Sequence, residues 1–585
     1  MKQLFRGGRR KVAAVMAIAL VASLSQVAPT SAAPTAKKAG GSITVGVFNQ
    51  LLSTCFSPNA ANSALGIMKT VYEGWFEKTK DGKIVPYLAE AFTPSADYKS
   101  WTVKIRPGVT FHDGTTLNSA AAIANITATQ GMYYLAVTAK GGNARHTLGS
   151  GIPFIANLKS VTALSTDTFR MDLWNGQVDF PETVYASGRN FVRAVSDLTN
   201  ATQCVTSGKG TGPFMFKSVS PTETVVIKNP NYWRKDKAGE QLPYLDQITF
   251  KYVNQASQRV KGLQSGALDA AQFTSAGEVK QILSVQADKD LQIIDSGFTY
   301  YPMTILNTAI EPFNNKNARL AVAYAFDAET FFQQRNCFKG KCIGQVGDSM
   351  VGSTNVMYNK KGFITYDLKK AKEYVAAYKA ETGKDLVFTQ PADTSAEAQA
   401  SAKTVAQIMK KAGITMNILT EDTATITAKA FPTPGTGVNS YQAYPTLLFE
   451  GRDTAFVLPF LPSNTFGAPG NLTVAGLRAQ AGALAAGTFQ AFGALINPGR
   501  TSDKTLDALV WDAWYDITSA RSAKLKAVTK YYQENAYSIH QPYMGYYTGM
   551  SSKLKGWDKF FLASGGQGIA MTNAGINYTG LYLEK

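Results

Sequence analysis

Few residues of the kinds that carry out chemistry occur in this sequence, and they are far apart. The chain has three histidines, one of which lies in the tripeptide His112-Asp113-Gly114. A histidine beside an aspartate can serve in catalysis, but this tripeptide is also typical of a tight turn, and we expect His112 to make a structural hydrogen bond there. The chain contains no GxSxG, HExxH or EF-hand pattern. The sequence therefore predicts no catalytic residues, and we expect a protein that is not an enzyme and holds no metal and no cofactor.

A glycine-rich stretch, GTGPF, occupies residues 210–214. A loop that cradles phosphates would need the pattern GK[ST] after a glycine and four further residues, and this stretch does not supply it. Two glycines followed by a proline favour a rigid turn before a strand that contains Phe214 and Phe216. We therefore do not expect a nucleotide-binding site here.

Four cysteines, Cys55, Cys204, Cys337 and Cys342, allow three pairings. Residues 337–342 enclose a loop that contains a glycine, so we expect a disulfide between Cys337 and Cys342, which leaves Cys55 to pair with Cys204. A metal or redox site built from these thiols is the alternative, but the chain has no CxxC pattern to support it. The expected disulfides suit a protein that is exported from the cytoplasm.

The first 32 residues have the three parts of a secretory signal peptide. A basic start is followed by an almost wholly apolar stretch at 12–24, by Pro29 and by small residues up to Ala32. This apolar stretch, at about 1.5 Å per residue, is too short to cross a hydrocarbon core of about 30 Å, so we expect cleavage near Ala32 rather than a membrane anchor. A buried N-terminal helix and a twin-arginine signal at Arg9-Arg10 are the alternatives. No cysteine lies near the cut, so we expect export to a periplasm or the cell exterior without lipid attachment there.

The formal net charge of +18 is compatible with a nucleic-acid partner, an anionic surface or an anionic ligand. Five positive charges lie in the predicted signal peptide. The rest of the chain has no basic stripe interleaved with aromatic residues. We therefore expect scattered surface lysines and no nucleic-acid partner.

A chain of 585 residues is too long for one hydrophobic core, and at about 150 residues per domain it predicts two to four domains. Apolar residues at helical spacing predict a helix over 65–76, and a second, short helix is expected to end near Gly266. Alternating apolar residues predict strands at 43–47, 101–105, 169–173 and 248–252.

The clearest local pattern lies between residues 363 and 420. Asp367 is expected to cap a helix that Gly383 ends. The pattern then predicts a strand at 386–389, a helix at 396–411 and a strand at 414–419. Strand, helix and strand at this spacing form a βαβ unit, so the sequence predicts an α/β fold with a partly parallel sheet.

Two later stretches, 424–437 and 461–470, are rich in proline, glycine and threonine. We expect both to be long surface loops. A helical region is predicted from residue 506 to about residue 536.

Eight short motifs follow one another in a recognisable order. They are VYEG at 71–74, IVPYLAE at 84–90, WTVKIRPGV at 101–109, FHDG at 111–114, GTGPF at 210–214, NPNYW at 229–233, LQSGALD at 263–269, and PF at 312–313 leading through RLA at 319–321 to Asp327. In this order they resemble the large solute-binding proteins of ABC importers, the oligopeptide, dipeptide and nickel class that forms bacterial solute-binding protein family 5. The resemblance extends over nearly all of the mature chain.

The resemblance implies a bilobed clamp of the periplasmic-binding-protein type, with an additional third domain and sheets of mixed parallel and antiparallel strands. When the domain boundaries of the resembling proteins are transferred to this chain by the positions of the motifs, lobe I comprises residues 41–78, 205–302 and 535–585. The extra domain, 79–204, packs on lobe I, and lobe II comprises 303–534. The ligand is expected between the two lobes, which close on it by a hinge motion.

The resemblance also implies a function. We expect the solute-binding component of an ABC importer, a monomer that captures a small polar ligand, foremost an oligopeptide, and delivers it to the membrane subunits of a permease. An oligosaccharide, a nickel chelate or a haem-like compound is the alternative ligand. An exported enzyme or an envelope interaction protein is a more remote alternative.

By the same resemblance, two segments of the chain are expected to face the ligand. One is the loop after the first strand, with Phe48 and Asn49. The other is the strand that precedes residue 307, with Tyr301 and Met303.

The proteins that this chain resembles have an aromatic and acidic segment in the second lobe. The best match to it in this chain is at Phe449, Glu450, Arg452 and Asp453. Phe449 stands where those proteins have a tryptophan, and Thr454 follows Asp453 in place of their proline. The resemblance implies that Asp453 pairs with the amino terminus of a peptide ligand and that Arg452 is available to a carboxylate.

Overall fold

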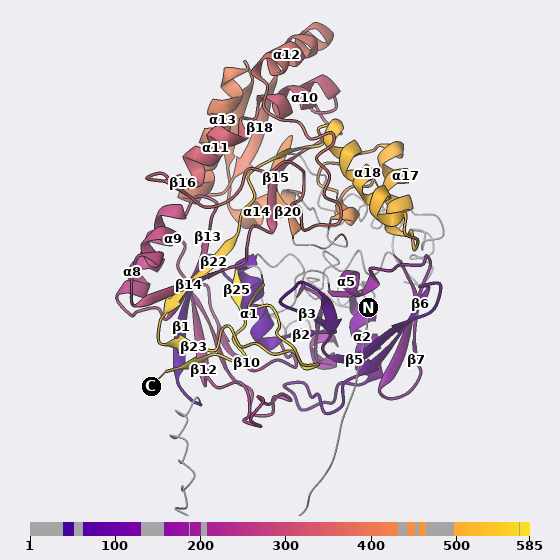
Figure 1. Cartoon of the computed structure of the whole chain (residues 1–585), viewed down its shortest axis with the longest axis vertical. Coiled ribbons are helices and arrows are strands. Elements are labelled where there is room, and N and C mark those ends of the chain that lie inside the picture. Colours follow the sequence, from indigo (N-terminus) through magenta and orange to yellow (C-terminus); the bar gives the residue numbers. More distant parts are fainter. Residues whose placement is uncertain are drawn as a thin grey trace, which may run out of the picture. The chain divides into compact units, whose positions relative to one another are not determined.

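The structure is a computed structural model, and it describes residues 39–51, 62–129, 157–185, 188–199, 207–430, 441–450, 454, 457–463, 497–572 and 574–584 (Figure 1). The chain divides into two compact units, Met1–Lys37 and Lys38–Lys585. The predicted signal peptide lies outside the described residues. None of the helices in the described ranges combines the length and the apolar character needed to cross a bilayer.

A sheet of seven strands is the largest in the described part of the chain. Its order is β10 (Phe214–Val219), β11 (Glu223–Lys228), β12 (Gln247–Tyr252), β1 (Ser42–Val47), β13 (Ala270–Thr274), β22 (Tyr546–Ser551) and β14 (Leu291–Asp295). β1 runs parallel to β12 and β13, and the other neighbours are antiparallel. Ile43 and Val45 of β1 are 2% and 0% exposed, as the alternation of apolar residues predicts. The predicted mixture of parallel and antiparallel strands is confirmed.

Three helices pack on this sheet: α1 (Asn62–Val71), α8 (Ala256–Gln264) and α9 (Val279–Gln286). α8 connects β12 to β13 and ends as predicted, since Gly266 follows it with φ +73°. The predicted helix over 65–76 is wrong at its end, because α1 stops at Val71. Beyond it, β2 (Glu73–Gly74) pairs with β9 (Phe191–Val192), and β3 (Phe76–Lys78) pairs with β4 (Ile84–Pro86). The helical spacing was misleading because Phe76 of β3 and Trp75, between β2 and β3, are buried in a different core.

A second, wholly antiparallel sheet has the order β5 (Ala89–Pro94), β6 (Ser100–Ile105), β8 (Thr168–Leu173) and β7 (Leu158–Ala163). Both β6 and β8 were predicted from their alternating apolar residues. The helices α2 (Ser119–Thr129), α5 (Phe180–Tyr185) and α6 (Val195–Thr199) follow in this part of the chain. Trp101 and Phe169, with 4% and 0% exposure, lie in its core.

The central part of the chain contains the predicted βαβ unit. β18 (Val387–Ala392) and β19 (Thr415–Thr420) are parallel, and α13 (Ala396–Lys411) connects them. α12 (Leu368–Thr382) precedes the unit. Its cap residue Asp367 accepts a hydrogen bond from the Lys370 N–H, and Gly383 ends it with φ +72°. α10 (Lys316–Ala325) and α11 (Ala328–Arg335) share a core with this unit.

A three-stranded antiparallel sheet has β15 (Tyr300–Leu306) between β20 (Ala443–Glu450) and β21 (Ser538–His540). α17 (Lys504–Trp514) and α18 (Arg521–Glu534) pack against it and confirm the predicted late helical region. The expected loop over 424–437 is wrong in part, because α14 (Thr423–Ala430) occupies its start. Asp422 stabilises that helix start by accepting hydrogen bonds from the Thr425 N–H and hydroxyl at 2.9 and 2.6 Å. Residues 431–437 and most of the loop predicted at 461–470 lie outside the described ranges.

A small hairpin consists of β16 (Cys337–Phe338) and β17 (Lys341–Cys342). The predicted disulfide between Cys337 and Cys342 is confirmed. Cys55 and Cys204 lie outside the described residues, so their pairing stays a prediction.

The described chain passes between the seven-stranded and three-stranded sheets at two places, from β14 to β15 and from β21 to β22. The two connections lie side by side. Tyr300 and Met544 exchange backbone hydrogen bonds, and the Ser296 hydroxyl accepts one from the Tyr546 N–H at 2.9 Å. Gly545 is required here, because a Cβ on it would lie 2.5 Å from the Gly297 carbonyl oxygen.

Candidate functional site

The parallel strands β1, β12 and β13 end at the same edge of the seven-stranded sheet. In α/β sheets of this kind, ligands bind outside the carboxyl ends of the strands, where loops converge. Phe48 follows β1 directly, and the Val253 N–H after β12 donates to the Val47 carbonyl at 2.8 Å. After β13, Ser275 exchanges hydrogen bonds with Gly545 in a connection between the two sheets. This edge therefore adjoins the hinge-like connections, and its place at the strand ends makes it the candidate ligand-binding position.

Three aromatic rings from different segments meet at this edge. The half-buried Phe48 stacks on Tyr546 with ring centroids 6.2 Å apart, and Tyr546 meets Tyr300 edge to face at 4.7 Å. Phe48 was predicted from the sequence, whereas Tyr300 and Tyr546 were not. Tyr300 and Tyr546 are only 6% and 5% exposed and belong to the core beneath β1, so Phe48 is the more accessible of the three rings. Aromatic rings with phenol groups suit recognition of amphipathic ligands, but ligand contact by the two tyrosines is not shown.

A buried ion pair holds the loop beside Phe48. Arg259 of α8 has a fully buried side chain and contacts Glu278 at 2.6 Å. The Arg259 guanidinium also donates to the carbonyls of Val253 and Asn254 and lies 5.5 Å from the Phe48 ring. Loss of hydration raises the pKa of Glu278, and the adjacent Arg259 opposes that rise. The pair fixes the loop after β12 against the loop after β1.

The structure brings several of the predicted ligand residues together across β15 and β20. Tyr301 is the cross-strand neighbour of Phe449, and Tyr300 that of Glu450. Tyr301 and Met303 are only 1% and 0% exposed. The Tyr301 ring packs edge to face on Tyr543 at 5.0 Å. Both side chains thus belong to a core in this structure, and ligand contact by them stays a prediction.

Arg452 and Asp453 lie outside the described residues, and only the backbone of Phe449 and Glu450 is described. Thr454, the next residue, is described and buried. Its hydroxyl donates to Oδ2 of Asp179 at 2.8 Å, and Arg521 at the start of α18 contacts the same oxygen at 2.5 Å. Thr454 is therefore joined to residues 157–185, which include β7, β8 and α5.

Four of the sequence motifs meet at one buried carboxylate, Glu73. It accepts hydrogen bonds from the Thr211 hydroxyl at 2.8 Å, from the Tyr232 hydroxyl at 2.6 Å and from the Trp233 ring N–H at 2.9 Å. The Tyr87 hydroxyl lies 3.1 Å from the same group. Burial raises the pKa of Glu73, and these hydrogen bonds counteract the rise. These motifs thus have a structural role where residues 71–94 meet the turn at 210–213.

His112 has the predicted structural role. Its Nδ1 accepts a hydrogen bond from the Gly210 N–H at 3.2 Å, so Nε2 carries the proton that it donates to the Gly212 carbonyl at 3.0 Å. Loss of hydration lowers the pKa of His112 to about 4. Gly210 and Gly212 pack directly on the backbone of Val71, where a Cβ would lie 2.1 and 2.6 Å from atoms of that residue. The GTGP stretch is a packed turn at the end of α1.

Sequence reasoning missed Arg259, Tyr300 and Tyr546. A signal existed for Arg259, because it occupies the apolar face of α8 between Ala256 and Leu263, where a charge needs a buried partner. Tyr300 and Tyr546 gave no local signal, since their meeting depends on the two connections between the sheets.

The comparisons with known proteins agree with this architecture. The family model of bacterial extracellular solute-binding proteins, family 5 Middle, matches residues 83–443, more than half of the chain. The glutathione-binding protein GsiB of Pectobacterium atrosepticum is 28% identical over 283 residues, which are 48% of this chain and 51% of GsiB. This chain thus matches only about half the length of that relative.

Two solved structures share the fold at low sequence identity. The periplasmic binding protein DppA of Helicobacter pylori, in complex with the peptide STSA, has a TM-score of 0.74 and 18% identity, and the match covers 94% of this chain and 99% of DppA. AgaA of A. tumefaciens R10, in complex with agropinic acid, has a TM-score of 0.73 and 19% identity over 93% of this chain and 99% of AgaA. The α/β architecture of this chain is therefore that of the bilobed periplasmic binding proteins. On the match of the family model, the chain belongs to the bacterial extracellular solute-binding proteins of family 5.

Proposed function

We propose that this chain is the solute-binding component of an ABC importer, exported to a periplasm or the cell exterior. It captures a small polar ligand between two closing lobes and delivers it, chemically unchanged, to a membrane permease. Membership of family 5 supports this role. The observation that carries it is the edge where β1, β12 and β13 end, because it combines a ligand-binding position with the two connections between the sheets.

Lobe I of this proposal comprises residues 41–78, 205–302 and 535–585 and contains the seven-stranded sheet. Lobe II comprises 303–534, and residues 79–204 form the extra domain. The side-by-side connections near Gly297 and Gly545 act as the hinge. Closure is favoured by contacts that exist only in the closed form.

A peptide is the ligand that the comparisons favour, since GsiB is named for glutathione and DppA was solved with a peptide. The half-buried Phe48 ring, which packs on Tyr546, is the apolar contact that we assign to the side chains of the ligand. Asp453 pairs with the ligand's amino terminus and Arg452 with a carboxylate. AgaA, with its agropinic acid, supports the second candidate, a binder of another small polar solute.

Replacing Asp453 by alanine is expected to weaken peptide binding by about 2–5 kcal/mol, because an ammonium group desolvated in the closed cleft would lose its counter-charge. Isothermal titration calorimetry of the mature protein against peptide, sugar and metal-chelate libraries first identifies the ligand. The same measurement then compares the affinity of the unaltered protein with that of Asp453→Ala. The control is Asp558→Ala, since Asp558 is an exposed acid in the C-terminal part of the chain. Unchanged affinity in Asp453→Ala would contradict the assigned role, and conversion of any ligand to a product would contradict the proposed function.

A further inference from the structure

A pocket that shares no lining residue with the β1 edge lies beside β21. Its volume is about 260 Å³, and α10, α11, two loop segments and β21 contribute its lining. A volume of about 10–15 Å³ on this measure holds one water, and an engineered apolar cavity of about 150 Å³ binds benzene. The pocket is therefore large enough for an aromatic ring with a short side chain.

The walls of this pocket are mainly apolar. Phe326, directly after α10, Phe363 from a loop and Ile539 from β21 line it, together with Ala323 of α10. The lining also contains the acids Asp327 and Glu329 at the start of α11, and neither Lys nor Arg is among the described residues that line it. The pocket thus combines an apolar body with an acidic side.

His540 does not add a positive charge to the lining at neutral pH. Loss of hydration lowers its pKa to about 3. Its Nε2 lies 3.2 Å from the Ser538 hydroxyl on the same strand. The charged groups of the lining are therefore Asp327, which caps α11 by accepting from the Thr330 N–H and hydroxyl at 2.9 and 2.6 Å, and the exposed Glu329, which accepts from the Gln333 amide at 2.8 Å.

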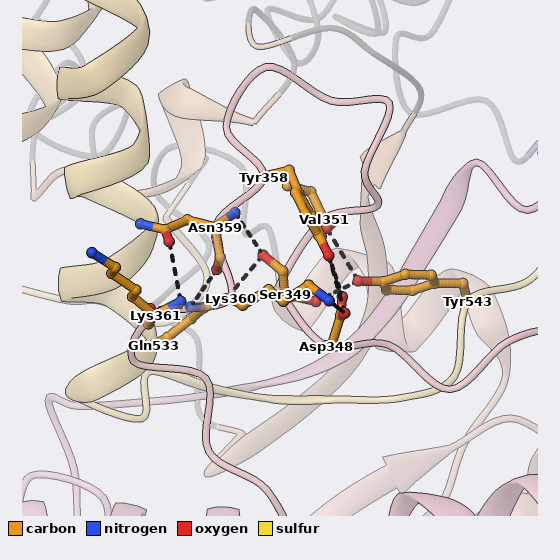
Figure 2. Close-up of polar contacts among 9 residues, drawn as sticks. All are labelled: Asp348, Ser349, Val351, Tyr358, Asn359, Lys360, Lys361, Gln533 and Tyr543. Carbon is orange, nitrogen blue, oxygen red and sulfur yellow. Dashed lines mark hydrogen bonds and ion pairs between the residues drawn. The ribbon is translucent and has the colours of Figure 1, made fainter.

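The pocket is held open by hydrogen bonds that fix its loop walls. Figure 2 shows Gln533 beside Ser349, Asn359 and Lys361, which lie in the stretch of chain between the lining residues 346–347 and 363–366. The Gln533 side-chain oxygen accepts from the Ser349 hydroxyl at 3.2 Å and from the Met350 N–H at 2.7 Å, and its amide donates to the carbonyls of Asn359 and Lys361 at 3.1 and 3.0 Å.

Tyr543 fixes the same loop from the other side. Its hydroxyl donates toward the carbonyls of Ser349 at 2.7 Å and Val351 at 3.1 Å (Figure 2). Gly347 packs so closely on the Tyr543 ring that a Cβ would lie 2.5 Å from it. Walls fixed in this way do not need to be ordered by a ligand, which favours binding.

We propose that this pocket is a second ligand site, separate from the cleft, and that it takes a small arylalkyl amine. The aromatic ring lies among Phe326, Phe363 and Ile539, and the ammonium group faces Asp327 and Glu329. An anionic compound of the same shape is disfavoured, because the pocket would place its charge beside two acids without a cation.

Phenethylamine and phenylpropionate are the matched probes, since they share the ring and differ in the sign of the charge. Isothermal titration calorimetry at neutral pH is expected to show saturable binding of phenethylamine and severalfold weaker or no binding of phenylpropionate. Absence of phenethylamine binding, or equal affinity for both probes, would overturn the proposal.

Two variants locate the binding. Ala323→Leu fills the pocket and is expected to abolish phenethylamine binding, while Ala376→Leu, on the exposed face of α12, leaves it unchanged. Glu329→Gln, at an exposed position, is expected to weaken phenethylamine severalfold and to reduce the preference over phenylpropionate. If phenethylamine binds Ala323→Leu as tightly as it binds the unaltered protein, its site lies elsewhere and the proposal is overturned. If Ala323→Leu does not fold, as judged by circular dichroism, the Glu329→Gln result decides.

Discussion

At the scale of single residues, His112 links pH to stability. In the folded protein the pKa of His112 is lowered to about 4 from a usual 6.5. The unfolded state therefore binds more protons between these two values, so the contribution of His112 is complete above pH 6.5 and is lost as the pH falls toward 4. The slope is about 1.4 kcal/mol per pH unit over this window, a loss on the order of 3 kcal/mol.

His112→Gln tests this linkage. The variant is expected to be about 1–3 kcal/mol less stable at pH 7, because the Gly210 N–H and Gly212 carbonyl lose their partner. Urea unfolding from pH 7 to pH 4.5 should show the difference between the two proteins shrinking, since only the unaltered protein loses the His112 contribution. His540 titrates in both proteins, so its effect cancels. A difference that stays constant with pH would contradict the lowered pKa.

The residues of the candidate site were predictable only where their signal is local. Phe48 was predicted because it directly follows the first strand and the resemblance marks that loop. Arg259, by contrast, binds a carboxylate 19 positions further along the chain, and Tyr546 meets a ring 246 positions before it. Spacing along the chain carries no information on such contacts, because the order of strands in the sheet determines them.

At the scale of elements, the same distinction separates the correct predictions from the wrong ones. α12 was predicted closely because Asp367 and Gly383 act within a few residues of its ends, and α13 was predicted from its own helical pattern. The end of α1 was wrong because residues 73–74 pair with the distant β9 and residues 76–78 form a hairpin with β4, and this pairing overrides helical spacing. α14 was missed because Asp422 caps a segment whose threonines favour loops.

The disulfide hairpin is an element whose covalent link is testable by itself. Replacing both Cys337 and Cys342 by serine is expected to lower the free energy of unfolding by about 2 kcal/mol, the loop-closure entropy for a loop of this length. Asn336 precedes the hairpin and donates to the Ser275 carbonyl at 2.9 Å, so the loosened hairpin also adjoins the end of β13. Denaturant unfolding measures the change, and mass spectrometry under non-reducing conditions confirms that the other cysteines keep their state. If the double variant were as stable as the unaltered protein, the prediction would be contradicted, because loss of the disulfide would not have increased the entropy of the unfolded chain.

At the scale of the whole molecule, the parallel unit between residues 387 and 420 was predicted, because its strands and helix are consecutive. The order of the seven-stranded sheet was not. β1 lies between β12 and β13, and β22, from the end of the chain, separates β13 from β14. These placements decide where the ligand edge lies and how the two larger sheets are connected. The resemblance to family 5 predicted the mixture of parallel and antiparallel strands but not this order, and spacing along the sequence could not supply it.

The contact between Asp179, Thr454 and Arg521 gives the proposed closure a specific test. Asp179 lies in the proposed extra domain and the other two in lobe II, and both charged side chains are nearly buried, with 7% and 15% exposure. If the clamp opens by separation of these parts, the pair exists only in the closed form and both groups are hydrated in the open form.

Asp179→Asn removes the charge with almost the same shape, so we expect ligand affinity to fall by about 2 kcal/mol, a factor of about 30. The loss should appear as faster dissociation with little change in association, because the contact forms after capture. Stopped-flow measurement of both rates with the peptide found by calorimetry checks this, with Asp558→Asn as the matched control. An unchanged dissociation rate would mean that this contact does not hold the lobes together.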